Sequence, residues 1–139
     1  MSHPRSEMRR SIRDALVASV GMAGVRVFKS WSHSVGREDV PAVGVFTPRE
    51  ITRGGTGDSV DRTTTIVVLY RAEGGDDLDD DLDDISAVIE PIVLDALADF
   101  QLFALDETDI EINGEGEKRQ GRLTLTFSAE RYTPEGTPS

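Results

Sequence analysis

The densest group of side chains that could bind a metal is a run of aspartates between positions 76 and 84. Clustered carboxylate oxygens are the ligands that Ca²⁺ and Mg²⁺ prefer. A calcium-binding loop beginning at Asp77 would need a glycine and a glutamate where the chain has Leu82 and Val88. On a helix these carboxylates would also point in different directions instead of converging on one ion. We therefore predict no metal site, and an Asp-rich metal-binding module is kept only as the minor alternative. The run comprises Asp76, Asp77, Asp79, Asp80, Asp81, Asp83 and Asp84.

Other residues that could catalyse a reaction are few. His3 lies near the start of the chain, where we expect little order, and His33 lies between two serines in a polar segment. The glycine-rich segment 54–57 lacks the lysine of a phosphate-binding loop, and no G-x-S-x-G motif occurs. The sequence therefore predicts no catalytic residue, no cofactor and no enzymatic activity. Trp31 is compatible either with the core or with an interface.

Length and composition limit the class of protein further. The 139 residues suit one domain, and the formal net charge of −11 disfavours binding to the phosphate backbone of nucleic acids. There is no cysteine, so disulfides and thiolate metal sites are excluded. No apolar run approaches the roughly 20 residues that span a bilayer, and no secretory segment is apparent. We expect a protein that works without a membrane, in the compartment where it is made.

The aspartate run opens the longest predicted helix, Asp77–Phe100. Its apolar residues recur at spacings of three and four, which is typical of an amphipathic helix. The early carboxylates suit the positive end of the helix dipole, and Pro91 predicts a bend or short break near Glu90. A flat apolar surface must receive this helix, and the β-like segments 62–71 and 121–132 are the best candidates. The apolar stripe consists of Leu78, Leu82, Ile85, Ile89, Ile92, Ala96 and Phe100.

The rest of the chain reads as one further helix and several strands. Both faces of the strand predicted at 63–70 are apolar, which indicates a central strand covered on both sides. Pro48 predicts a bend between two separate short strands. The sequence therefore predicts an α+β fold: a mostly antiparallel or mixed sheet packed with an N-terminal helix and one long central helix. We expect a single domain over 1–139 with flexible tails at 1–5 and 133–139. The other predicted elements are a helix at 6–20 and strands at 24–30, 42–46, 50–53, 102–105, 108–113 and 121–132.

Two polar segments rich in glycine and charge, Thr52–Asp61 and Asn113–Gly121, are predicted to be mobile loops. Such segments bury little on their own and become ordered when a partner supplies contacts. We predict that they contact other subunits or a partner protein through five charged residues: Arg53, Asp58, Glu117, Lys118 and Arg119.

The order of elements resembles a known protein family. The helix SEMRRSIRDALVASV precedes the strands DVPAVGVF and RTTTIVVLY. A glycine-acidic break then leads to LDDISAVIEPIVLDAL, and a hairpin closes in RLTLTFSAERY. This layout, over nearly the whole chain, is similar to that of the tail terminator proteins of long-tailed phages, the lambda minor tail protein U type. The dense aspartate run departs from the family pattern.

The resemblance implies a viral structural protein rather than an enzyme. Such a protein forms a homohexameric ring on the last ring of a siphophage tail tube, stops tube polymerisation and completes the tail for head-tail joining. Its partners would be other copies of itself, the tail tube protein and a head-tail connector or neck protein, without a membrane or specific nucleic-acid binding. Its location would be the virion tail, and the host cytoplasm during assembly. A neck or head-completion protein of similar size is the alternative.

Overall fold

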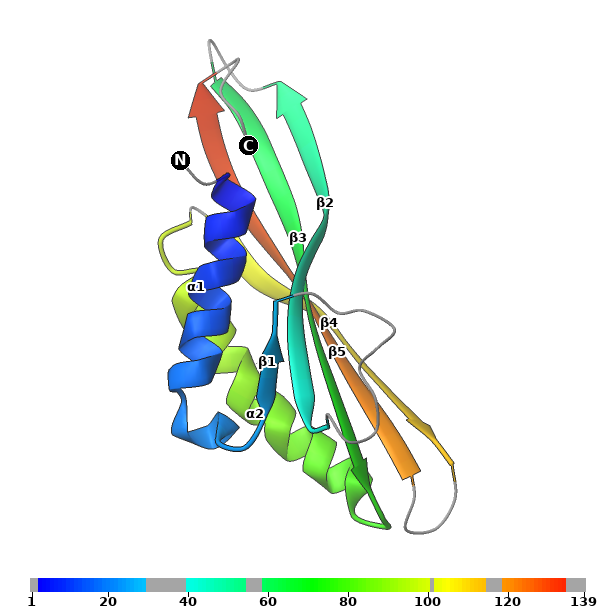
Figure 1. Cartoon of the computed structure of the whole chain (residues 1–139). Coiled ribbons are helices and arrows are strands. Elements are labelled where there is room, and N and C mark those ends of the chain that lie inside the picture. The colour runs from blue at the N-terminus through cyan, green and yellow to red at the C-terminus, as the bar shows by residue number, and fades with distance from the viewer. Residues whose placement is uncertain (1–2, 30–39, 55–58, 101, 115–118, 135–139) are drawn as a thin grey trace.

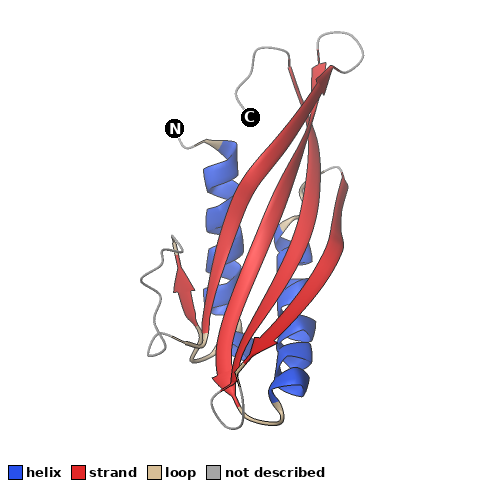
Figure 2. Ribbon diagram, turned by 90° about the vertical axis from the view of Figure 1, so that its right-hand side faces the viewer, coloured by secondary structure: helices blue, strands red, loops and turns tan. Residues whose placement is uncertain are grey.

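Two helices pack on one face of a five-stranded sheet (Figures 1 and 2). The computed structural model describes residues 3–29, 40–54, 59–100, 102–114 and 119–134. The strand order is β1-β2-β3-β5-β4, with β1 parallel to β2 and all other neighbours antiparallel. The predicted α+β fold with a mixed sheet is therefore confirmed. The elements are α1 (Pro4–Ala18), the 3₁₀ turn η1 (Val20–Met22), β1 (Arg26–Phe28), β2 (Ala42–Gly54), β3 (Ser59–Gly74), α2 (Leu78–Ala96), β4 (Leu102–Asn113) and β5 (Arg119–Pro134).

The core lies between the helices and the sheet. From α1 it receives Met8, Ile12 and Leu16, which are spaced by one helical turn. Alternate residues of each strand complete it, because successive side chains of a strand point to opposite faces. The strand contributions are Val43, Val45, Ile66, Val68, Tyr70, Leu123, Leu125, Phe127 and Ala129.

The helix α2 runs without interruption through Pro91, which is exposed. The helix has no break at this proline, so the short break predicted as one possibility near Glu90 does not occur. Beyond Ile89 the fully buried positions are Val93 and Leu97, whereas Ile92 and Ala96 are only partly buried. The buried stripe therefore advances in steps of four along this part of the helix, where the prediction had taken steps of three and four.

The strands extend beyond the predicted bounds. Pro48 does not separate two strands, because β2 continues through it with a register shift between Phe46 and Arg49. An irregularity of this kind accommodates a residue without a backbone N–H. The strands β2 and β3 also take in residues 52–54 and 59–61, so most of the first predicted loop is strand. Likewise 119–121 belong to β5, and residues 55–58 and 115–118 lie outside the described part of the chain.

The N-terminal end is also more ordered than predicted. The His3 side chain caps α1 by accepting a hydrogen bond of 3.1 Å from the backbone N–H of Arg5. Residues 4 and 5 belong to α1, and 133 and 134 belong to β5.

The central strand β3 differs from its prediction in one respect. It lies in the middle of the sheet, but both helices lie on the same side of it (Figure 2). Its residues Ile66, Val68 and Tyr70 are buried beneath the helices, while Val67 and Leu69 on the opposite face are half-buried. The prediction that both faces of this strand are covered is therefore wrong for the described part of the chain.

Candidate assembly surfaces

The helix-free face of the sheet is the broadest surface that the described helices leave uncovered. On β5 its side chains are those of Arg122, Thr124, Thr126, Ser128 and Glu130, which alternate with the fully buried residues of that strand. On β3 they are paired in register with Thr63, Thr65, Val67, Leu69 and Arg71. The apolar and threonine side chains of this face are half-buried, so the face is neither a core nor a strongly hydrated surface. It has the composition of a surface that can be covered by another protein.

One edge of the sheet is formed by β4. Within the described residues this strand pairs with β5 and with no other strand. Three of its large apolar side chains are exposed: Leu102 by 61%, Phe103 by 37% and Ile110 by 38%. An edge strand presents a row of unpaired N–H and C=O groups, which is a ready template for pairing with another chain. Its charges are all negative, from Asp106, Glu107, Asp109 and Glu111.

At the opposite edge of the sheet, the short strand β1 covers only the first part of β2. The short strand β1 pairs with β2 only from Ala42 to Gly44, so the remainder of β2 pairs on one side only among the described residues. Two exposed arginines, Arg49 and Arg53, lie on this open part, and neither forms an ion pair with another described residue. The two open edges of the sheet therefore carry opposite charges.

The predicted partner-binding residues are not brought together in the part of the chain that the structure describes. Arg53 is exposed on the open part of β2, as expected. Arg119 begins β5, is half-buried and has a buried Nε that finds no hydrogen-bond partner among the described residues, so it is not the freely exposed loop residue that was predicted. Asp58, Glu117 and Lys118 lie outside the described residues. The acidic residues of β4 were not selected from the sequence, because nothing in a single sequence shows that their strand lies at an edge.

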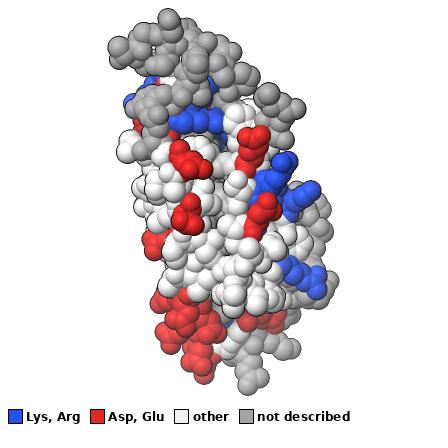
Figure 3. Space-filling view, turned by 90° about the vertical axis from the view of Figure 1, so that its left-hand side faces the viewer, with Lys and Arg blue, Asp and Glu red and all other residues white. Residues whose placement is uncertain are grey.

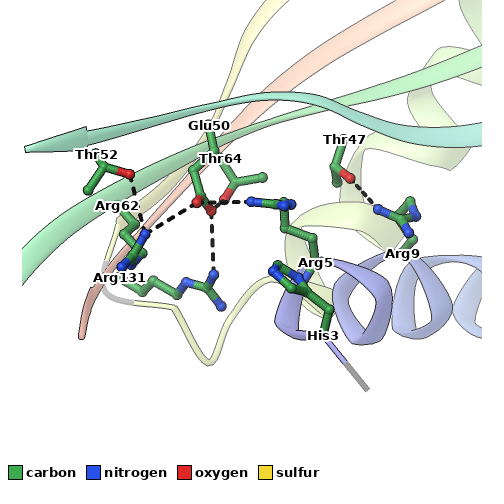
Figure 4. A network of polar contacts seen from close by, with 9 residues as sticks. All are labelled: His3, Arg5, Arg9, Thr47, Glu50, Thr52, Arg62, Thr64 and Arg131. Carbon is green, nitrogen blue, oxygen red and sulfur yellow. Dashed lines mark hydrogen bonds and ion pairs between the residues drawn. The ribbon is translucent and has the colours of Figure 1, made fainter. Parts of the chain in front are cut away.

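A second feature that the sequence did not reveal is a charged cluster around Glu50 on the helix-covered face (Figure 4). The Glu50 side chain is only 7% exposed, and its carboxylate lies 3.0 Å from Arg5, 3.4 Å from Arg131 and 3.7 Å from Arg62. It also accepts a hydrogen bond of 2.9 Å from the Thr64 hydroxyl. Burial lowers the pKa of Arg131, and the nearby carboxylate opposes this shift.

This cluster joins the start of α1 to three strands. Arg5 comes from the helix, Glu50 from β2, and Arg62 and Arg131 from β3 and β5. A nearly buried carboxylate needs paired charges and hydrogen bonds to offset its lost hydration. The cluster therefore fixes the part of the sheet around Glu50 against the start of α1, and we assign it a structural role.

The aspartate run forms an exposed acidic patch at the start of α2. All seven of its aspartates are exposed, and they gather at one end of the molecule in Figure 3. Asp77 is the N-cap residue but makes no side-chain capping hydrogen bond, so the benefit of these charges is that of the helix dipole alone. Within the described residues no group of three or more histidines and acidic residues is arranged to hold a metal ion.

A hollow of about 350 Å³ lies beside the acidic patch, between the end of β3 and the first turns of α2. Tyr70, Leu78 and Asp81 are among the residues that line it. Burial raises the pKa of the Tyr70 hydroxyl, and the Asp81 carboxylate raises it further.

None of the helices among the described residues is both long enough and apolar enough to cross a membrane.

Comparison with models of known protein families and with characterised proteins gave no match to this chain. Its role is therefore argued from the geometry of the fold and its surfaces.

Proposed function

We propose that this chain is a structural virion protein that assembles into a ring, caps the tail tube of a long-tailed phage and stops its polymerisation. The observation that carries the proposal is the asymmetry of the sheet. One face is used to build the monomer, whereas no described helix or strand packs on the other face or pairs with the two open edges, which are therefore available for contacts with other chains. The similarity of the element order to tail terminator proteins supplies the identity of those chains.

The proposed role requires surfaces of three kinds: one toward neighbouring copies, one toward the tube and one toward the head connector. The edges and the helix-free face serve the first two. The acidic patch at the start of α2 lies at one end of the elongated sheet (Figures 1 and 3). Complementary charge on a partner would favour docking of that end and fix its orientation.

Polymerisation in vitro of a tail tube protein from the same phage tests the proposal. Tubes grown in the presence of the purified protein should stop at shorter lengths, and electron microscopy should show one ring-shaped cap on a tube end. Unchanged tube length and bare tube ends would overturn the proposal. A neck or head-completion protein, the alternative, would bind DNA-filled heads and leave tube length unchanged.

A further inference from the structure

We infer that copies of this chain join edge to edge, with β4 of one copy lying antiparallel to the open part of β2 of the next. This inference rests on the proposed function only for the identity of the partner, a second copy of the chain. It is carried by the two open edges, their opposite charges and the position of β1.

The direction of the strands permits such a joint. The strands β2 and β5 run the same way, since both are antiparallel to β3. The strand β4 is antiparallel to β5 and therefore also to β2. When one sheet continues into the next with the helices on the same side, β4 and β2 meet as an antiparallel pair. The joint is head-to-tail, so it can be repeated around a closed ring.

The charges select one register. Arg49 and Arg53 are four residues apart on β2, and Glu107 and Glu111 are four residues apart on β4. All four side chains belong to the helix-free face, because their ladder partners include Thr65, Thr126 and Arg122 of that face. In an antiparallel pair with Arg53 opposite Glu107, Arg49 comes opposite Glu111. The Glu111 carboxylate also pairs with Arg122 of its own sheet, so it would be shared between the two arginines. Opposite charges directly across a strand pair are favourable, whereas like charges there are unfavourable.

The short strand β1 independently requires the same shift. Within one copy, Gly44 of β2 and Asp109 of β4 lie level with each other across the sheet. If neighbouring copies were joined without a shift along the strands, Asp109 of the neighbour would lie beside Gly44, where Phe28 of β1 already pairs. In the register chosen by charge, the neighbour's β4 ends at Asn113, opposite Thr47. It therefore stops before it reaches β1.

The shift also has the size that a closed sheet needs. It displaces neighbouring copies by six residues, the separation of Thr63 and Leu69 on β3. Six residues span about 20 Å along a strand, and four strands are about 19 Å wide. Strands would then tilt by about 45° to the ring axis, at the upper end of the tilt of closed barrels.

Charges and irregularities on edge strands also occur in proteins that use them to prevent pairing. The two roles are separated by exchanging the charges. One variant carries Arg49→Glu and Arg53→Glu, and a second carries Glu107→Lys and Glu111→Lys. Native mass spectrometry reports the size of the assemblies, and thermal melting reports the fold. Asp80→Lys with Asp84→Lys on α2 is the matched control, which should assemble as the native protein does.

Each edge variant alone should lose assembly, because like charges then face each other at every joint. The chain with all four substitutions should regain it, and so should an equimolar mixture of the two variants, in which copies alternate. Assembly of either single-edge variant at the native level would overturn the inference. So would failure of both the four-substitution chain and the mixture to assemble while melting as the native protein does.

A cross-link tests the register without changing charge. Thr52 and Thr108 are exposed and come opposite each other on the helix side of the proposed joint. Because the chain has no cysteine, Thr52→Cys with Thr108→Cys introduces the only thiols. Oxidation should join most copies covalently into oligomers. The control Thr52→Cys with Phe103→Cys should not cross-link, because Phe103 is exposed on the same face as Thr108 but pairs with β5 four residues further along. Native-sized rings without the cross-link would overturn the inference while leaving the proposed function intact. Rings that cross-link but do not cap tubes would overturn the proposed function while leaving the inference about the joint intact.

Discussion

The two faces of one sheet differ in how completely the chain itself covers them. On the covered face Ile66, Leu125 and Phe127 are fully buried, whereas on the helix-free face Val67 and Thr126, their immediate neighbours in sequence, are half-buried. The same strands therefore serve two purposes through alternate residues. Substitutions on the covered face should change the free energy of unfolding, and substitutions on the helix-free face and edges should change assembly.

The largest expected effect is that of Ile89→Ala in α2. Ile89 has no exposed surface, so its truncation should lower the free energy of unfolding by about 2–5 kcal/mol, the range for buried aliphatic residues. Chemical denaturation of the unassembled protein measures it. Val67→Ala on the helix-free face should cost less than about 1.5 kcal/mol, because a half-buried side chain leaves no closed cavity. Equal losses for the two variants would remove the distinction between the faces.

The next largest effect is expected at Glu50. Glu50→Gln keeps the shape but leaves Arg62 and Arg131 without their carboxylate, so the free energy of unfolding should fall by roughly 3 kcal/mol. Glu111→Gln is the matched control, and both variants are measured on the unassembled protein so that contacts between copies do not contribute. The control removes an ion pair with Arg122 in which both side chains are about half exposed, and should cost less than about 1 kcal/mol. A Glu50 variant as stable as the control would show that the cluster does not hold the sheet to α1.

A smaller effect should appear at high pH. Folding raises the pKa of Tyr70 above its ordinary value of 10.0, so the unfolded chain loses this proton first as the pH rises. The contribution of Tyr70 is fully present below pH 10 and is lost as the pH rises through the folded pKa. Stability measured across this range should fall less steeply for Tyr70→Phe than for the native chain. Parallel curves would contradict the assignment.

No effect is expected from divalent metals beyond that of ionic strength. The exposed carboxylates of α2 diverge around the helix, and the spacing lacks the glycine and glutamate of a calcium loop. The melting temperature in millimolar Ca²⁺ or Mg²⁺ should match that in an ionic-strength control. Saturating stabilisation that disappears with Asp79→Asn and Asp81→Asn would contradict this interpretation.

Periodicity was sufficient to predict the class of fold. The spacing of Met8, Ile12 and Leu16 located α1, and the alternation from Leu123 to Ala129 located the buried face of β5. The ends of the strands were harder to predict from the sequence. The outer parts of β2 and β3 are polar, and they are held together by backbone pairing and by the Glu50 cluster rather than by burial of apolar side chains. Pairing partners far apart in the sequence leave no local pattern.

The candidate assembly surfaces were less predictable for the same reason. Arg53 could be selected as a charge next to a glycine-rich segment, but Glu107 lies in a strand whose alternation is that of any half-exposed strand. Only the order of strands in the sheet places it on an edge. The apolar side chains of Val67 and Leu69 led to the prediction that elements of the same chain cover both faces of this strand. A surface that binds another chain would have the same apolar composition.

Amide hydrogen exchange on the assembled and dissociated protein compares the two regions in one measurement. The amides of α2 around Ile89 should be protected in both states, because the monomer alone buries them. The amides of β4 from Asp106 to Glu111 that point away from β5, and those of β2 from Arg49 to Gly54 that point away from β3, should exchange rapidly in the dissociated protein and slowly in the ring. Rapid exchange of both segments in the ring would contradict the account, because the sheet edges would then not be the surfaces through which copies assemble.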